Sequence, residues 1–296
     1  MPIRILGCIL CILTSSTLLA QDDLMGELEN MQGEQIDYTI ATFKGSRVIN
    51  GHSVEMRSPG VLEFLISHRF GRLNSGAYEF FGLDEANIRL GLEYGLLPGL
   101  NIGIGRSSFE KTFDGFLKYK LLRQSSGARV MPVSAVFFTS VALNSLRTPV
   151  DRPMDFSERL VYTYQLLLAR KFSDKFSLQI SPTLIHWNIV PEPDDDNDQI
   201  SLGVAGRYKL TGSVALNLEY HHRLNPFDNN TYNSLAIGFD IETGGHVFQL
   251  HLTNSRAMIE KGFINETTGD FFDGDIHFGF NISRVFQLKK NESSNW

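Results

Sequence analysis

The stretch GDIHFGFNISRVFQL, Gly274 to Leu288, decides the fold of this chain, because its side chains change character at every step. Apolar residues occupy every second position: Ile276, Phe278, Phe280 and Ile282. Polar or small residues lie between them: His277, Gly279, Asn281 and Ser283. Successive side chains of a strand point to opposite faces, so the pattern predicts a strand with one apolar and one polar face.

The same alternation recurs from Val61 onward, whereas helical spacing is almost absent. It predicts about twelve strands, at residues 61–70, 86–94, 99–107, 113–122, 131–143, 159–172, 176–190, 199–210, 213–223, 232–241, 246–253 and 274–286. The connections after the odd strands are mostly long and polar, and those after the even strands are mostly tight. Alternating long and short connections are typical of an up-and-down meander with one rim outside the cell and the other in the periplasm.

Alternation alone does not say which face points inward. A closed barrel of twelve strands has an interior wider than side chains fill, so apolar residues turned inward would leave a costly void. Turned outward they meet hydrocarbon, and closure pairs every backbone N–H and C=O, as lipid requires. A soluble two-sheet sandwich would hide the same apolar face. Aromatic residues near the predicted strand ends favour the membrane barrel: Phe70, Tyr94, Phe113, Tyr162, Phe172, Phe176, Trp187, Tyr208, Tyr220, Tyr232 and Phe286. We therefore predict an all-β, closed, antiparallel transmembrane barrel at residues 61–288, followed by a C-terminal tail at 289–296.

Residues 1–20 have the layout of a secretory signal peptide, with Arg4 near the start, an apolar run from Ile5 and small or polar residues up to Ala20. We expect cleavage after Ala20 and insertion into the outer membrane of a Gram-negative cell. Both cysteines, Cys8 and Cys11, lie in this segment, so the mature chain is predicted to have neither a disulfide nor a cysteine-bound metal. Losing Arg4 leaves 26 of the 27 basic residues against 33 acidic ones, which disfavours nucleic acid as a partner.

Residues 21–60 do not fit the meander. The acidic QDDLMGELENMQGEQ predicts a short helix or a disordered tail, and the following residues are mixed and charged. One hypothesis is that residues 39–57 fold into the lumen as a partial plug, with Lys44, Arg47, Glu55 and Arg57 pairing with charges of the wall. The other is that residues 21–60 form a loose periplasmic leader.

Several segments together resemble a known family. They are ATFKGSRVINGHSVE, LEFLISHRFG, FGLDEANIRLGLEYGL, FDGFLKYKLLRQ and FQLHLTNS. They are similar to bacterial outer-membrane β-barrel proteins grouped as a domain of unknown function, over about residues 41–286. The resemblance implies the barrel fold and the outer-membrane location. It implies no catalytic residue and no ligand.

HLTNSR, from His251 to Arg256, is similar to the His-x-Ser segment of outer-membrane phospholipase, a twelve-strand barrel whose histidine activates a serine two residues later. Here Thr253 replaces that serine. The alternation puts His251 and Thr253 toward the lumen, away from a bilayer substrate, and no third group to orient the base is identifiable. We therefore predict a hydrogen-bonded pair of lumen residues and no enzyme, with a hydrolase as the third alternative for function.

Three other patterns are weak. His221 and His222 are adjacent on one strand and point to opposite faces, while His251 and His277 are expected as ordinary lumen residues, so no metal site is predicted. PEPDDDNDQ resembles the start of a calcium loop but has Gln199 and Ala205 where glycine and glutamate are needed. GIGRSS lacks the helix that follows a dinucleotide fingerprint, and no cofactor is expected.

The lumen is the better indication of function. The residues predicted to line it are Glu63, Arg69, Arg89, Glu93, Asp114, Lys118, Lys120, Arg207, Lys209, Glu219, Asp240, His251 and His277. Six are basic, five acidic and two are histidines, so the lining favours no single sign of charge. We expect a porin-like passive channel for a small hydrophilic solute, surrounded by outer-membrane lipid. The alternative is a non-transporting envelope component whose long loops, residues 144–158 and 254–273, bind a protein partner.

Overall fold

The structure is a computed structural model that describes residues 35–147, 154–227, 230–243 and 246–289. The predicted signal peptide, most of the acidic stretch after it and residues 290–296 of the predicted tail lie outside the described residues. The chain divides into two compact units, one of residues 1–39 with 124–132 and one of residues 40–123 with 133–296. In the first unit, β1 (Ile36–Tyr38) pairs antiparallel with β6 (Ser125–Gly127), a short sheet that the sequence analysis did not predict.

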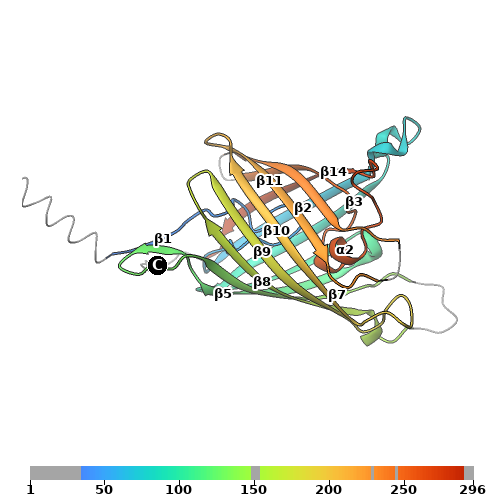
Figure 1. Cartoon of the computed structure of the whole chain (residues 1–296), viewed down its shortest axis with the longest axis horizontal. Helices are drawn as coiled ribbons and strands as arrows, with labels where there is room; N and C mark the ends of the chain where they lie inside the picture. The colour runs from blue at the N-terminus through green and yellow to red at the C-terminus, as the bar shows by residue number, and fades with distance from the viewer. Residues whose placement is uncertain (1–34, 148–153, 228–229, 244–245, 290–296) are drawn as a thin grey trace, which may run out of the picture. The chain divides into compact units, whose positions relative to one another are not determined.

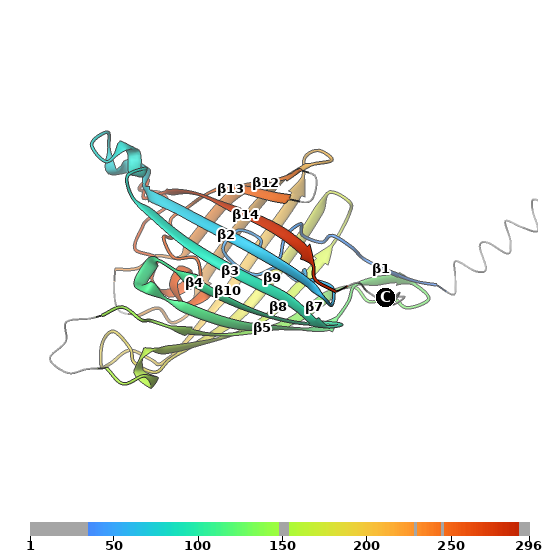
Figure 2. The same ribbon diagram turned by 180° about the vertical axis from the view of Figure 1, so that it is seen from behind.

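Twelve strands of the second unit form a closed antiparallel barrel (Figure 1; Figure 2, from behind). They are β2 (Val61–Arg72), β3 (Ala86–Leu97), β4 (Leu100–Ser107), β5 (Phe113–Leu122), β7 (Ser134–Leu143), β8 (Leu160–Lys171), β9 (Phe176–Trp187), β10 (Asp198–Lys209), β11 (Val214–Arg223), β12 (Ser234–Thr243), β13 (His246–Thr253) and β14 (His277–Gln287). Each strand pairs with its neighbours in this order, and β14 pairs with β2 to close the ring. The predicted closed up-and-down barrel is confirmed.

Strand β3 shows why the sequence folds this way. Its side chains alternate between exposed and buried, with Ile88 and Leu90 exposed to 41% and 45% on the outside. Arg89 and Glu93 point inward and are almost fully buried. Apolar side chains on the outside are stable only against hydrocarbon, since in water they would form a large exposed patch.

Some strand ends differ from the predicted ones by up to three residues. Strand β7, for example, begins at Ser134 rather than at residue 131. Pro132 explains the difference, because proline has no N–H to donate to a sheet and is tolerated only at strand edges.

The inner face is not small or polar throughout, which corrects the sequence analysis. On β7 and β8, inward-facing Val136, Phe138, Leu167 and Ala169 are buried in one apolar cluster. The apolar side chains of Phe43, Val48, Ile49 and Val54, which precede β2, pack against them inside the barrel.

In the described parts of the connections there are four 3-10 helices, η1 (Leu73–Ser75), η2 (Phe80–Gly82), η3 (Phe109–Lys111) and η4 (Ser157–Arg159). The connection from β13 to β14 also forms a short helix, α2 (Glu260–Asn265), all of whose residues are buried. Both views show α2 within the outline of the barrel (Figures 1 and 2). Residues 260–265 of the long loop 254–273, in which a partner site was the alternative prediction, are therefore not exposed. In the described part of the chain, no helix is both long and apolar enough to cross a membrane.

Candidate functional site

Residues 42–57, which we call the hairpin, lie inside the barrel. Residues 42–54 are buried apart from the half-buried Lys44. The backbone N–H of Val48 donates to the carbonyl of Gly51 at 2.9 Å, and that of Ser53 donates to the carbonyl of Ser46 at 2.9 Å. The segment is therefore a tight hairpin whose tip, residues 48–51, points into the lumen.

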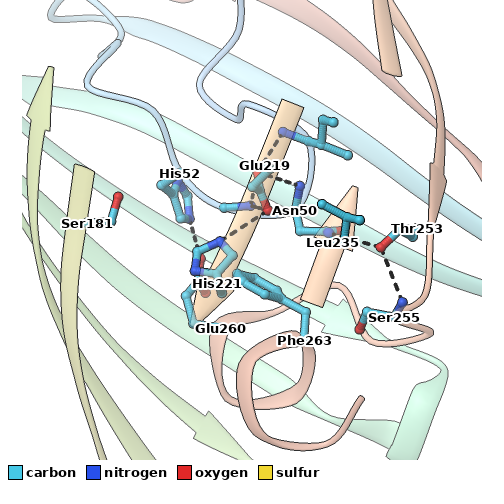
Figure 3. Close-up of polar contacts among 12 residues, drawn as sticks. Asn50, His52, Ser181, Glu219, His221, Leu235, Thr253, Ser255, Glu260 and Phe263 are labelled. Carbon is cyan, nitrogen blue, oxygen red and sulfur yellow. Dashed lines mark hydrogen bonds and ion pairs between the residues drawn. The ribbon is translucent and has the colours of Figure 1, made fainter. Parts of the chain in front are cut away.

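A buried carboxylate of the wall binds this tip. Glu219 on β11 accepts hydrogen bonds from the backbone N–H groups of Ile49, Asn50 and Gly51 at 3.1–3.2 Å (Figure 3). The same carboxylate lies 3.3 Å from the Nε2 atom of His221, two residues along the strand. Successive backbone N–H groups that converge on one carboxylate form an anion-binding nest. Glu219 thus stabilises the tip through its charge and not through apolar packing.

Amide and guanidinium side chains from other strands also bind the hairpin. Gln179 of β9 accepts from the backbone N–H of Val54 at 3.0 Å and donates to the carbonyl of His52 at 2.8 Å. Three further donors bind backbone or side-chain oxygens of residues 48–50: Gln249 of β13, Asn281 of β14 and Arg69 of β2. The hairpin is therefore bound to strands from several sides of the barrel.

The four charged residues proposed to pair with the wall have different partners. Lys44 lies 2.6 Å from Glu242 of β12, and Arg57 lies 3.1 Å from Glu63 of β2. Arg47 instead faces Glu260 of α2 at 3.4 Å. The Glu55 carboxylate accepts from the backbone N–H of Phe43, within the segment itself, at 3.2 Å. Lys44 and Arg57 thus pair with charges of the wall, whereas Arg47 pairs with α2. Glu55 also interacts electrostatically with Lys120 of β5.

Helix α2 fills the lumen from the long-loop end. Its Phe263 and Ile264 are fully buried and pack against Ile185 and Trp187 of β9. Its Lys261 ammonium lies 2.8 Å from Glu266 and 2.8 Å from Glu110 of η3. Burial lowers the pKa of Lys261, but the two carboxylates outweigh it and raise the pKa overall, so the lysine stays charged.

The hairpin and α2 meet at Glu260. Its Oε1 atom lies 3.4 Å from Arg47 and 3.8 Å from the Nε2 atom of His52, and all three side chains are buried. Burial raises the pKa of Glu260, while Arg47 opposes the rise. Burial and the neighbouring cation of Arg47 lower the pKa of His52 well below its usual range. His52 is therefore neutral at pH 7, and its two ring nitrogens have no hydrogen-bond partner among the described residues.

The predicted lining residues of the wall point inward. Eleven are buried, Glu63, Arg69, Arg89, Glu93, Asp114, Lys118, Arg207, Glu219, Asp240, His251 and His277, and two are half-buried, Lys120 and Lys209. Arg89 forms an ion pair with Asp114, and Lys118 lies 3.8 Å from Glu93. A side chain at Gly105 would collide with the Arg89 guanidinium, so glycine here leaves room for that ion pair.

Little space remains between the hairpin, α2 and the wall. Three internal cavities of about 10 Å³ each lie beside the hairpin, two of them lined by His52. A cavity of this size holds about one water molecule. These cavities beside the hairpin are therefore too small for a sugar or an amino acid.

The His251 and Thr253 side chains do not contact each other as the sequence predicts. The predicted hydrogen bond between His251 and Thr253 is absent, because both ring nitrogens of His251 lack a partner and Thr253 Oγ1 accepts instead from Asn50 and Ser255. Within the described ranges, no group of three histidine, cysteine, aspartate or glutamate side chains converges as metal ligands would.

Sequence reasoning missed His52, Glu260 and the lumen amides Gln179, Gln249 and Asn281. The amides lie at alternate strand positions facing inward, so the same period-two pattern could have identified them, had uncharged residues been included. His52 and Glu260 lie outside the meander, and no periodic signal marks them.

Comparison with known proteins agrees with this geometry. The sequence profile of the family described as membrane bound beta barrel domain (DUF5777) matches residues 43–286, from the first buried apolar residue of the hairpin to the last strand. The chain belongs to this family. It is therefore a membrane-bound β-barrel protein, as the resemblance implied.

Solved barrels are similar at low sequence identity. The NanC porin is 8% identical, with a TM-score of 0.49, over 77% of this chain and 100% of that one. The KdgM porin is 8% identical, with a TM-score of 0.44, over 77% and 99%. The COG4313 outer membrane channel from Pseudomonas putida F1 is 13% identical, with a TM-score of 0.41, over 78% and 97%. No curated protein sequence matches the chain.

Proposed function

We propose that this protein is an outer-membrane channel for a small hydrophilic solute, and that the hairpin and α2 hold it closed at rest. The proposal rests on the kind of contacts that hold the hairpin in the lumen. The hairpin is held by ion pairs and hydrogen bonds to lumen side chains, including a nest on Glu219, and by an apolar cluster with β7 and β8. Water replaces such bonds at small net cost, since each contributes only about 1 kcal/mol. These polar contacts make the plug displaceable, and its displacement leaves a lumen lined mostly by charged and polar side chains beside the apolar patch on β7 and β8.

Deleting residues 21–57 tests the proposal. We expect the deletion to raise single-channel conductance in planar bilayers and to admit small sugars in liposome swelling, because it removes the whole hairpin. The full-length protein is the matched comparison, and both should run as heat-modifiable bands on a gel. If neither protein conducts, the competing function is favoured, a non-transporting barrel that acts through a partner.

A substitution in α2 tests whether this helix also limits the pore. In the deletion background, Lys261→Ala should raise conductance further, because Glu110 and Glu266 lose the cation that holds them against α2. Removing one member of a buried ion pair costs about 3–5 kcal/mol, somewhat less here because both carboxylates are partly exposed. An unchanged conductance would mean that α2 does not limit the pore.

Hydrolysis is not part of this proposal. His251 and Thr253 face the lumen and are not hydrogen-bonded to each other, so the threonine lacks the base that a nucleophile needs.

A further inference from the structure

A larger cavity lies at the long-loop end of the barrel, apart from the closed lumen. It has a volume of about 260 Å³, against about 10 Å³ for each internal cavity. Residues of the β2–β3 connection form one side, and residues around α2 and the start of β14 form the other. We call it the outer pocket, and its charged or hydrogen-bonding lining includes Arg72, Glu79, Glu85, Arg256, Thr268 and His277. Its volume is just below the roughly 300 Å³ at which small-molecule sites begin.

The outer pocket is lined by both basic and acidic side chains, and some of them can bind a ligand. Arg256 lies 3.4 Å from Glu85, and Arg72 lies 3.2 Å from Asp275 just beyond the pocket. These side chains are 22–54% exposed, and ion pairs so exposed contribute little to stability, so ligand groups can replace either partner. The Glu79 carboxylate has no hydrogen bond or ion pair with any described residue.

These groups define the chemistry of a ligand. Guanidinium groups bind carboxylates through paired, charge-assisted hydrogen bonds, and carboxylates bind ammonium groups in the same way. A ligand with only one sign of charge would satisfy one side of the pocket and be repelled by the other. A small molecule that carries both a carboxylate and an ammonium group satisfies both.

The outer pocket is also connected to the closure of the lumen. Arg72 Nη2 donates to the carbonyl and the hydroxyl of Thr268 at 3.2 and 3.3 Å. Thr268 follows the last residue of α2 by three positions. A ligand carboxylate that binds Arg72 therefore competes with a hydrogen bond that holds the chain leaving α2.

We propose that the outer pocket binds a small zwitterionic solute of the amino-acid or short-peptide class before that solute enters the lumen. The inference rests on the proposed channel function, because it names the class of solute for that channel. Arg72 and Arg256 bind the carboxylate, and Glu79 with Glu85 binds the ammonium group.

Calorimetric titration of the full-length protein in detergent tests the site with glycylglycine as the probe. We expect glycylglycine to bind, and N-acetylglycine and glycinamide, which each keep one charge, to bind at least about tenfold more weakly, since a charge-assisted hydrogen bond is lost. Arg256→Gln and Glu79→Gln should each weaken glycylglycine binding by about tenfold for the same reason. Arg147→Gln is the matched control, because Arg147 is an exposed arginine in another long connection and does not line the pocket.

The outcomes separate this inference from the channel itself. Glycylglycine binding that is absent, or equal in wild type, Arg256→Gln and Glu79→Gln, overturns the zwitterion site, even if the deletion of residues 21–57 conducts. Binding lost in these two variants and kept in Arg147→Gln supports the site. If glycylglycine binds in this selective way but neither the full-length protein nor the deletion of residues 21–57 conducts, the pocket is a ligand site and the proposed channel function is wrong.

Discussion

Replacing Glu219 by alanine should release the hairpin from the wall and open the lumen at neutral pH. The substitution leaves the backbone N–H groups of Ile49, Asn50 and Gly51 without their acceptor in a buried site. Each buried donor without a partner costs about 1–3 kcal/mol, so three cost at least about 3 kcal/mol. Since about 1.4 kcal/mol is a factor of ten, the released fraction should rise by about a hundredfold or more. Open probability in planar bilayers measures it, and tryptic cleavage at Lys44 and Arg47 reports the same release.

Glu242→Ala is the matched control for this experiment. Glu242 also pairs with the hairpin, through Lys44 at 2.6 Å, but both side chains are partly exposed, to 28% for Lys44 and 41% for Glu242. Exposed ion pairs contribute about 0–1 kcal/mol, so release should rise by less than about fivefold. Glu219→Gln keeps one acceptor oxygen and should lie between the two. Equal opening in Glu219→Ala and Glu242→Ala would show that the nest does not hold the hairpin.

The barrel was predictable from the sequence because two constraints act on every strand at once. Side chains alternate with a period of two, and lipid requires the outer set to be apolar, so a residue such as Ile88 marks its face without reference to its partners. Strand order followed from the alternation of connection lengths. The exceptions, such as inward-facing Phe138, lie where a non-strand segment packs against the wall.

The closure of the lumen was less predictable for a physical reason. Helix α2 has six residues and an internal glycine, Gly262, so neither propensity nor periodicity reveals it, and tertiary packing stabilises it. The charge of Arg47 marked the hairpin as a candidate plug, but its partner Glu260 is 213 residues away. Local patterns do not identify partners at such a separation.

The meeting of the hairpin with α2 makes the two closures interdependent. Arg47 and Glu260 are both buried, so whichever segment moves first leaves the other with an unpaired charge. An unpaired buried charge is far more costly than a paired one, and this favours joint movement of both segments.

Lowering the pH below about 6.5, the ordinary pKa of histidine, should favour the open lumen through His52. Burial and Arg47 lower the pKa of His52 in the closed state, so only the released hairpin takes up the proton readily. The contribution of neutral His52 to the free energy of closure is fully present above pH 6.5. It decreases as the pH falls, by up to about 1.4 kcal/mol per pH unit. Open probability of the full-length protein between pH 7.5 and 5 measures this dependence.

His52→Phe isolates the contribution of the imidazole. The ring of His52 packs 4.7 Å from that of Phe116 and 4.4 Å from that of Phe138, so phenylalanine keeps the aromatic contacts and removes the titrating group. Glu260 acts with the opposite sign, because its raised pKa lets the closed state bind a proton more readily than the released one. The wild type should therefore open more steeply than His52→Phe as the pH falls, and Glu260→Gln more steeply still. Identical pH profiles for wild type and His52→Phe would show that His52 does not control the closure.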